Sequence, residues 1–180
     1  FDTSLKWLFD LAKISKRLLP ETPVIVGGAS ATLSFDELFQ EVPYIDAICY
    51  SEGENAVCDL LDSNNINTSL SKDPWYTRNS KHSPKALTVD HLDEVINLDY
   101  DTVDISSYSM KESFSPYCSY REEKNVKQFF LVTSRGCPFK CTFCKADFMG
   151  GKLRSNSADF MIRTIKHVHE KYGQTHFTLT

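Results

Sequence analysis

The sequence contains no apolar run of membrane-spanning length, no low-complexity tract and no long basic run. A spanning helix needs about 20 consecutive apolar residues, so we expect no membrane association through such a helix. The net charge is −4, and without a basic cluster it argues against nucleic acid as a main partner. The N-terminal residues also lack the pattern of a signal peptide.

Cysteine is scarce as well, with 6 residues among 180 at irregular spacing. A secreted disulfide framework is therefore not expected, and a reducing cytoplasm fits better. The chain begins with Phe1 rather than Met, so we expect a piece of a longer protein. With 41% hydrophobic residues, it can still build a core of one domain and part of another.

Three of the cysteines stand together, and they dominate the sequence. Cys137, Cys141 and Cys144 form a C-x3-C-x2-C run directly after residues 129–133, an apolar stretch that predicts a buried strand. Thiolates this close repel one another unless a cation neutralises them. The pattern therefore predicts a metal centre whose three protein ligands leave one coordination position open.

The spacing favours iron and sulfur over zinc. Structural zinc sites commonly use two pairs of ligands, and no second pair is present. Iron–sulfur clusters are held by thiolates in compact loops. A zinc-stabilised binding module, for example one for nucleic acid, remains the non-enzyme alternative, with Cys118 as its fourth ligand.

Residues 134–144 resemble the signature of the radical S-adenosylmethionine (radical SAM) superfamily, C-x3-C-x-aromatic-C, with Phe143 as the aromatic residue. The resemblance implies a 4Fe-4S cluster on Cys137, Cys141 and Cys144, with S-adenosyl-L-methionine on the open iron and Phe143 near the adenosine. It also implies reductive cleavage to a 5′-deoxyadenosyl radical, and an electron donor such as flavodoxin or ferredoxin.

The first third of the chain alternates between helix and strand patterns. The expected order is a helix ending before Pro20, then a strand, helix, strand and helix over residues 23–28, 35–41, 44–50 and 55–61. This alternation predicts an α/β fold with a doubly wound, Rossmann-like sheet in residues 1–62.

Two glycine-containing loops follow the two predicted strands. Gly27-Gly28 and residues 51–54 would lie at the carboxyl edge of the sheet, where ligands bind in such folds. The glycines could equally serve only to turn each strand into its helix. Residues 27–32 do not match G-x-G-x-x-G, which disfavours a dinucleotide site.

The order of these loops resembles the C-terminal half of the cobalamin-binding domain found in many radical SAM enzymes. The resemblance implies that they line the groove for the nucleotide tail of cobalamin (vitamin B12). Tyr50-Ser51 precedes Glu52, where many relatives carry a small residue or glycine. The first strands of that domain are absent, so a histidine ligand to cobalt cannot be assigned. The implied cofactor-binding residues are Gly27, Gly28, Ser30, Glu52, Gly53 and Glu54.

Residues 63–128 carry little signal and are expected to form a linker, of which residues 92–101 resemble the segment between cobalamin and radical SAM domains. The cysteines outside the motif are expected to be buried small hydrophobes. They are Cys49, Cys58 and Cys118.

Residues 129–180 predict a strand, the cysteine loop, a helix capped by Ser155 or Ser157 and ended by Gly173, and a further strand. This is the first βα unit of a truncated, partial TIM-type barrel. Together with the resemblances, the sequence predicts a fragment of a cobalamin-dependent radical SAM enzyme that methylates an unactivated carbon of an unknown small molecule. The alternative is ring formation or rearrangement, as in the anaerobic porphyrin-ring cyclases.

Overall fold

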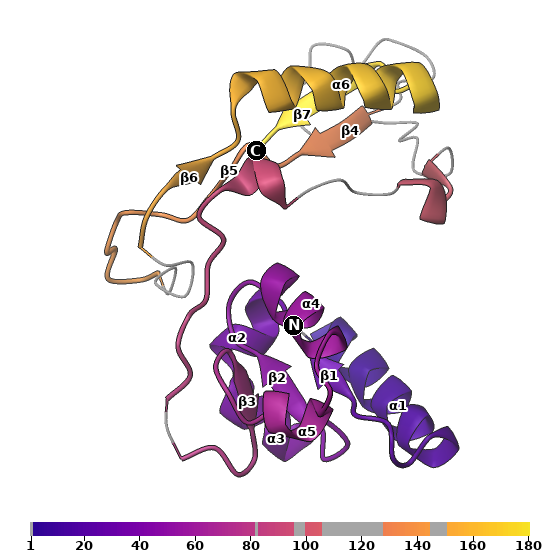
Figure 1. Cartoon of the computed structure of the whole chain (residues 1–180), viewed down its shortest axis with the longest axis vertical. Coiled ribbons are helices and arrows are strands. Elements are labelled where there is room, and N and C mark those ends of the chain that lie inside the picture. Colours follow the sequence, from indigo (N-terminus) through magenta and orange to yellow (C-terminus); the bar gives the residue numbers. More distant parts are fainter. Residues whose placement is uncertain (1, 82, 96–99, 106–127, 145–150) are drawn as a thin grey trace. The chain divides into compact units, whose positions relative to one another are not determined.

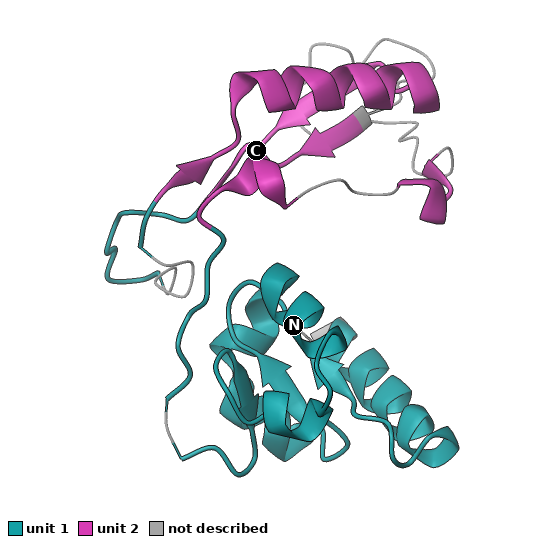
Figure 2. Ribbon diagram, in the orientation of Figure 1, with its two compact units in different colours: residues 1–89, 136–152 teal, residues 90–135, 153–180 magenta. Residues whose placement is uncertain are grey.

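The computed structural model describes residues 2–81, 83–95, 100–105, 128–144 and 151–180 (Figure 1). Cys118 lies outside these ranges. The chain forms two compact units, residues 1–89 with 136–152 and residues 90–135 with 153–180 (Figure 2).

The first unit is built on a three-stranded sheet of order β1-β2-β3. Its strands are β1 (Ile25–Val26), β2 (Ala47–Cys49) and β3 (Trp75–Thr77). β1 and β2 are parallel, with Ile25 opposite Ala47, whereas β3 runs antiparallel to β2. The helices are α1 (Asp2–Leu18), α2 (Ala29–Leu33), α3 (Phe35–Glu41), α4 (Glu54–Leu61) and α5 (Ile66–Ser69).

Helices cover both faces of this sheet. Successive side chains of β2 point to opposite faces, and they are buried in two different clusters. Ile48 is fully buried in a cluster with residues of α1, α2 and α3. Ala47 and Cys49 belong to a second cluster with Ala56 and Leu60 of α4. The two clusters sandwich β2 and hold its carboxyl end, and the loop after it, in place.

α1 carries a second apolar stripe that the described residues leave exposed. Trp7, Leu11, Ile14 and Leu18 are 70%, 60%, 45% and 66% exposed. Their spacing of i, i+4, i+7 and i+11 places them on one face of the helix. The helix is therefore more apolar around its circumference than the single buried stripe of a surface helix requires.

The second unit pairs two parallel strands, β4 (Gln128–Leu131) and β7 (His176–Leu179), along which α6 (Ala158–Tyr172) lies (Figure 1). A second pair, β5 (Ser134–Arg135) and β6 (Arg154–Ser155), is antiparallel and flanks the stretch that contains the cysteine motif. Two 3-10 turns precede these strands, η1 (Leu92–Glu94) and η2 (Tyr100–Thr102). The expected strand, loop, helix and strand are all present.

The ends of α6 agree with the sequence. The Ser157 side chain accepts a hydrogen bond from the Phe160 amide at 3.1 Å, and Gly173 ends the helix with a left-handed φ of 65°. The same N-terminus is also held from outside: Asp93 Oδ1 accepts hydrogen bonds from the Ser157 amide at 2.9 Å and from Asn156 Nδ2 at 3.2 Å. Residues of the expected linker thus pack within the second unit.

These elements confirm the mixed α/β class. The doubly wound sheet and the partial barrel remain predictions, because the described sheets have three and two strands. None of the helices in the described part of the chain has the length and apolar character to cross a membrane.

Candidate functional site

The glycine loop, residues 27–30, leads directly from β1 into α2. Gly28 is the N-cap residue of α2 and has φ 93° and ψ 174°, a combination that is essentially restricted to glycine. A Cβ added at Gly28 would meet no heavy atom within 4 Å. The loop therefore turns through a backbone conformation that needs glycine, and it leaves open space beside it.

The acidic loop, residues 51–54, leads from β2 into α4, with Gly53 as the N-cap residue of that helix. Ser51 has φ 75°, a left-handed conformation that non-glycine residues rarely adopt. This explains physically why glycine would suit position 51. The departure from the family pattern at Ser51 thus falls on a residue with a strained backbone.

The structure brings the two loops together. The Ser51 amide donates a hydrogen bond to Oγ1 of Thr32 at 3.1 Å, and Thr32 is only 2% exposed. Because β1 and β2 are parallel neighbours, both loops start at the same edge of the sheet. The sequence predicted both loops at this edge. It did not indicate Thr32 as the partner of Ser51, for which the only signal is its place four residues after Gly28.

The Glu52 carboxylate bonds to the backbone of a later segment of the chain. Glu52 Oε2 accepts a hydrogen bond from the Val89 amide at 2.6 Å. The Glu52 amide in turn donates to the Leu87 carbonyl at 3.3 Å. The acidic loop is therefore hydrogen-bonded on one side to Thr32 and on the other to residues 87–89.

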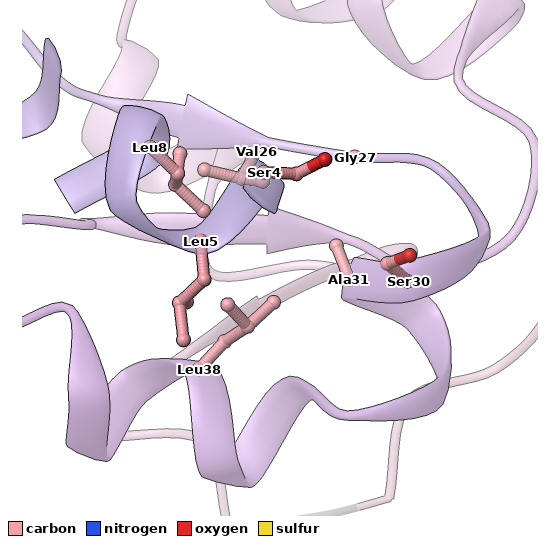
Figure 3. Close-up of a pocket in the computed structure, with 8 residues that line it drawn as sticks. All are labelled: Ser4, Leu5, Leu8, Val26, Gly27, Ser30, Ala31 and Leu38. Carbon is pink, nitrogen blue, oxygen red and sulfur yellow. The ribbon is translucent and has the colours of Figure 1, made fainter. Parts of the chain in front are cut away.

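An apolar cavity of about 240 Å³ lies beside the glycine loop (Figure 3). Leu5 of α1 and Leu38 of α3 point toward one another across it, and the hydroxyl oxygens of Ser4 and Ser30 are the polar side-chain atoms among its lining residues (Figure 3). Gly27 also lines it. The cavity thus joins two of the predicted cofactor-binding residues to an apolar space.

Cys49 lies beneath the acidic loop and not in it. It is 4% exposed, and burial, with a smaller effect of Glu54, raises the pKa of its thiol to about 11. Its Sγ lies 3.8 Å from the Glu52 carbonyl oxygen. The prediction of a buried small hydrophobe is confirmed for Cys49. It is wrong for Cys58, which is exposed because the buried face of α4 is formed by Ala56 and Leu60.

The cysteine motif follows β5 as a loop. Gly136 has φ 90° and begins it. Cys137 is half-buried, Cys141 and Cys144 are exposed, and the Cys144 amide donates to the Cys141 carbonyl at 3.1 Å in a turn. Phe143 is 91% exposed, so the predicted aromatic residue stands free on the surface of the first unit.

The donor set of this loop fits an iron–sulfur cluster in its chemistry: three thiols on one short, accessible segment. It is not assembled as a metal site, since no set of three His, Cys, Asp or Glu side chains that could hold a metal occurs within the described ranges. Ligation of iron by these cysteines therefore stays a prediction.

No protein-family model matches the chain, but curated proteins do. An uncharacterised methyltransferase of Pyrococcus horikoshii is 28% identical over 92% of this chain and 34% of its own length. A cobalamin-dependent radical SAM methyltransferase of Streptomyces tokunonensis is 28% identical over 74% of the chain and 19% of its own length. The anaerobic magnesium-protoporphyrin IX monomethyl ester cyclase of Cereibacter sphaeroides is 24% identical, over 93% and 26%.

The chain spans about a third or less of the length of these relatives. It is similar, at low identity, to methyltransferases and to an enzyme named as radical SAM and cobalamin-dependent.

Proposed function

We propose that this chain is part of a cobalamin-dependent radical SAM enzyme that transfers a methyl group to an unactivated carbon of a small molecule. The observation that carries the proposal is the C-x3-C-x2-C motif on an accessible loop that directly follows β5, within a strand–loop–helix–strand unit with parallel outer strands. The relatives support methyl transfer and the pairing of cobalamin with radical chemistry.

In this proposal Cys137, Cys141 and Cys144 hold a 4Fe-4S cluster and Phe143 packs near the adenosine of SAM. A bound cluster would pass an electron from a reduced donor such as flavodoxin or ferredoxin to SAM and so would supply the radical chemistry. The chain contributes ligation, orientation and exclusion of water. The exposed ring of Phe143 would then be covered by the adenosine of SAM, so its apolar surface would gain a partner.

The glycine loop and the acidic loop are proposed to border the cobalamin tail. Gly28 leaves open space where a flat ligand could approach the backbone, and the adjacent cavity is lined by Gly27 and Ser30. Gly53 and Glu54 follow at the start of α4. A cofactor held at this edge would rest on backbone rather than on long side chains.

The test of the cluster is anaerobic reconstitution of the purified chain with iron and sulfide. Replacing Cys137, Cys141 or Cys144 with Ala should abolish the absorbance of the cluster and its iron content. Cys58→Ala is the matched control, because Cys58 is also exposed but lies on α4. Stoichiometric zinc in aerobically purified protein, lost in Cys118→Ala, would instead support the zinc-stabilised binding module.

The test of the cobalamin site uses Gly28→Ala and Gly28→Val in the full-length protein, with Glu37→Ala on α3 as control. Both Gly28 variants carry a side chain at the same positive φ, which β-branched valine tolerates less well than alanine, so the fold of each variant is compared before its binding. Hydroxocobalamin should bind more weakly to Gly28→Val than to Gly28→Ala, provided that circular dichroism shows both folded. Equal, undiminished binding would make the glycine pair a strand terminator only.

A ring-forming reaction is the second candidate, favoured by the similarity to the cyclase. Product analysis of the full-length enzyme separates the two. Transfer of label from methyl-labelled SAM into the product supports methyl transfer. Conversion of substrate without a label in the product supports ring formation or rearrangement.

A further inference from the structure

Residues 86–89, the exit segment, are the last residues of the first unit before the chain enters the second at residue 90. The exit segment runs alongside the acidic loop: Ser51 and Leu87 form a parallel bridge. The Glu52 amide donates to the Leu87 carbonyl at 3.3 Å. The chain therefore leaves the first unit in contact with a loop of the proposed cofactor site.

The firmest point of this contact involves the Glu52 side chain. Its Oε2 accepts from the Val89 amide at 2.6 Å, and a hydrogen bond from a backbone amide to a carboxylate is charge-assisted. Val89 is 7% exposed, whereas Leu87, two residues before it, is 42% exposed. The segment is thus held at its end, at the residue that precedes the second unit.

The same loop is tied to α2, the helix that follows the glycine loop, through the Ser51 amide and Thr32 Oγ1. Thr32, the acidic loop and the exit segment therefore form one continuous hydrogen-bonded path from α2 to Val89. A displacement of the acidic loop would reach the exit segment through the Ser51–Leu87 bridge and, at Val89, through the Glu52 side chain.

We propose that Glu52 is a positioning residue that fastens the exit segment to the acidic loop, and that occupancy of this edge of the sheet by cobalamin is coupled through Glu52 to Val89 at the end of the exit segment. The coupling rests on the proposed cobalamin site, whereas the fastening rests on the hydrogen bonds alone. Glu52 thereby receives a role different from the direct cofactor contact that the family resemblance implies.

The fastening is tested by hydrogen exchange of the Val89 amide in the full-length protein without ligand. Glu52→Ala should speed exchange at Val89 at least tenfold, and Glu52→Gln, which keeps an oxygen acceptor without the charge, should give a smaller acceleration. Glu37→Ala is the control, because Glu37 is exposed on α3. Unchanged exchange at Val89 in folded Glu52→Ala would overturn the proposal. If Glu52→Ala does not fold, unchanged exchange in Glu52→Gln would do so.

The coupling is tested by adding hydroxocobalamin and following binding by absorbance and exchange at Val89 together. Binding should slow exchange at Val89 several-fold in the unmodified protein. Because coupling is reciprocal, Glu52→Ala should bind hydroxocobalamin more weakly, and at concentrations that saturate both proteins its exchange at Val89 should not slow. Equal slowing in both proteins would show that coupling does not pass through Glu52. An unmodified protein that binds no hydroxocobalamin would overturn the cofactor site and the coupling, whereas the fastening is decided by the ligand-free measurement.

Discussion

The Ser51 amide donates a 3.1 Å hydrogen bond to the buried hydroxyl oxygen of Thr32 and so joins the loops that follow β1 and β2. The two residues are 19 positions apart, and the contact exists because the parallel strands end side by side. The hydrogen bond connects the segments that follow the two strands at this edge of the sheet.

Thr32→Val should lower the free energy of unfolding by about 1 kcal/mol, because valine keeps the shape of threonine but removes the acceptor of the Ser51 amide. Thr32→Ser keeps the hydroxyl but removes a buried methyl group, so its cost of about 1 kcal/mol reports on packing. Urea denaturation of both variants and the unmodified protein measures the difference. A Thr32→Val variant as stable as the unmodified protein would mean that the hydroxyl contributes only its volume.

Ser51→Gly should stabilise the protein. A non-glycine residue in the left-handed region costs about 1–2 kcal/mol, and added glycine in the unfolded chain costs about 0.5–1 kcal/mol, so the net gain is roughly 0.5 kcal/mol. Ser83→Gly is the control in an exposed stretch of ordinary backbone and should be neutral or slightly destabilising. A loss of stability in Ser51→Gly would show that the serine side chain outweighs its backbone strain.

The two neighbouring glycines at the end of β1 should respond differently to alanine. Gly28→Ala places a side chain at φ 93° and ψ 174°, a strain of about 1–3 kcal/mol. At Gly27 the added Cβ would lie 3.6 Å from the Cys49 Cβ, an ordinary contact, so Gly27→Ala should change the free energy of unfolding by less than about 0.5 kcal/mol. Thermal or urea unfolding that ranks the two variants the other way would contradict this assignment.

The sequence predicted the elements whose signals are local. α3 has the expected bounds, and α6 has the expected cap at Ser157 and the expected stop at Gly173. α2 was missed, because a helix of five residues that starts at Gly28 without a side-chain cap has no periodic pattern. The antiparallel β3 and the exposure of Cys58 depend on tertiary packing.

The candidate site also divides into features with local sequence signals and features that depend on tertiary packing. Residue types and spacing indicated the cysteine motif and both glycine-containing loops, because these signals lie within a few neighbouring residues. The bonds from Thr32 to Ser51 and from Glu52 to Val89 span 19 and 37 positions. Contacts between segments that far apart follow from how the strands are placed, and a single sequence does not encode them locally.

The N-terminus of α6 depends on Asp93, a residue 64 positions before Ser157. Hydrogen bonds from Ser157, and then from Asn156, lower the pKa of the Asp93 carboxyl below its usual value of 3.8. A group with a lowered pKa in the folded state stabilises the protein above its unfolded pKa and loses this effect as the pH falls through the folded pKa. Asp93 should therefore contribute to stability at neutral pH and lose that contribution below about pH 3.8.

Asp93→Ala should lower the melting temperature at pH 7, because it removes the acceptor of the Ser157 amide at the start of α6. Asp93→Asn keeps an oxygen acceptor and should lose less, but its stability should no longer change with the ionisation of this position. Glu94→Gln removes a charge one residue away and is the matched control. Circular dichroism melts between pH 3 and pH 7 make the comparison: the gap between the unmodified protein and Asp93→Ala should narrow as the pH falls below 3.8. A gap that stays constant over this range would show that Asp93 acts through packing rather than through its carboxylate.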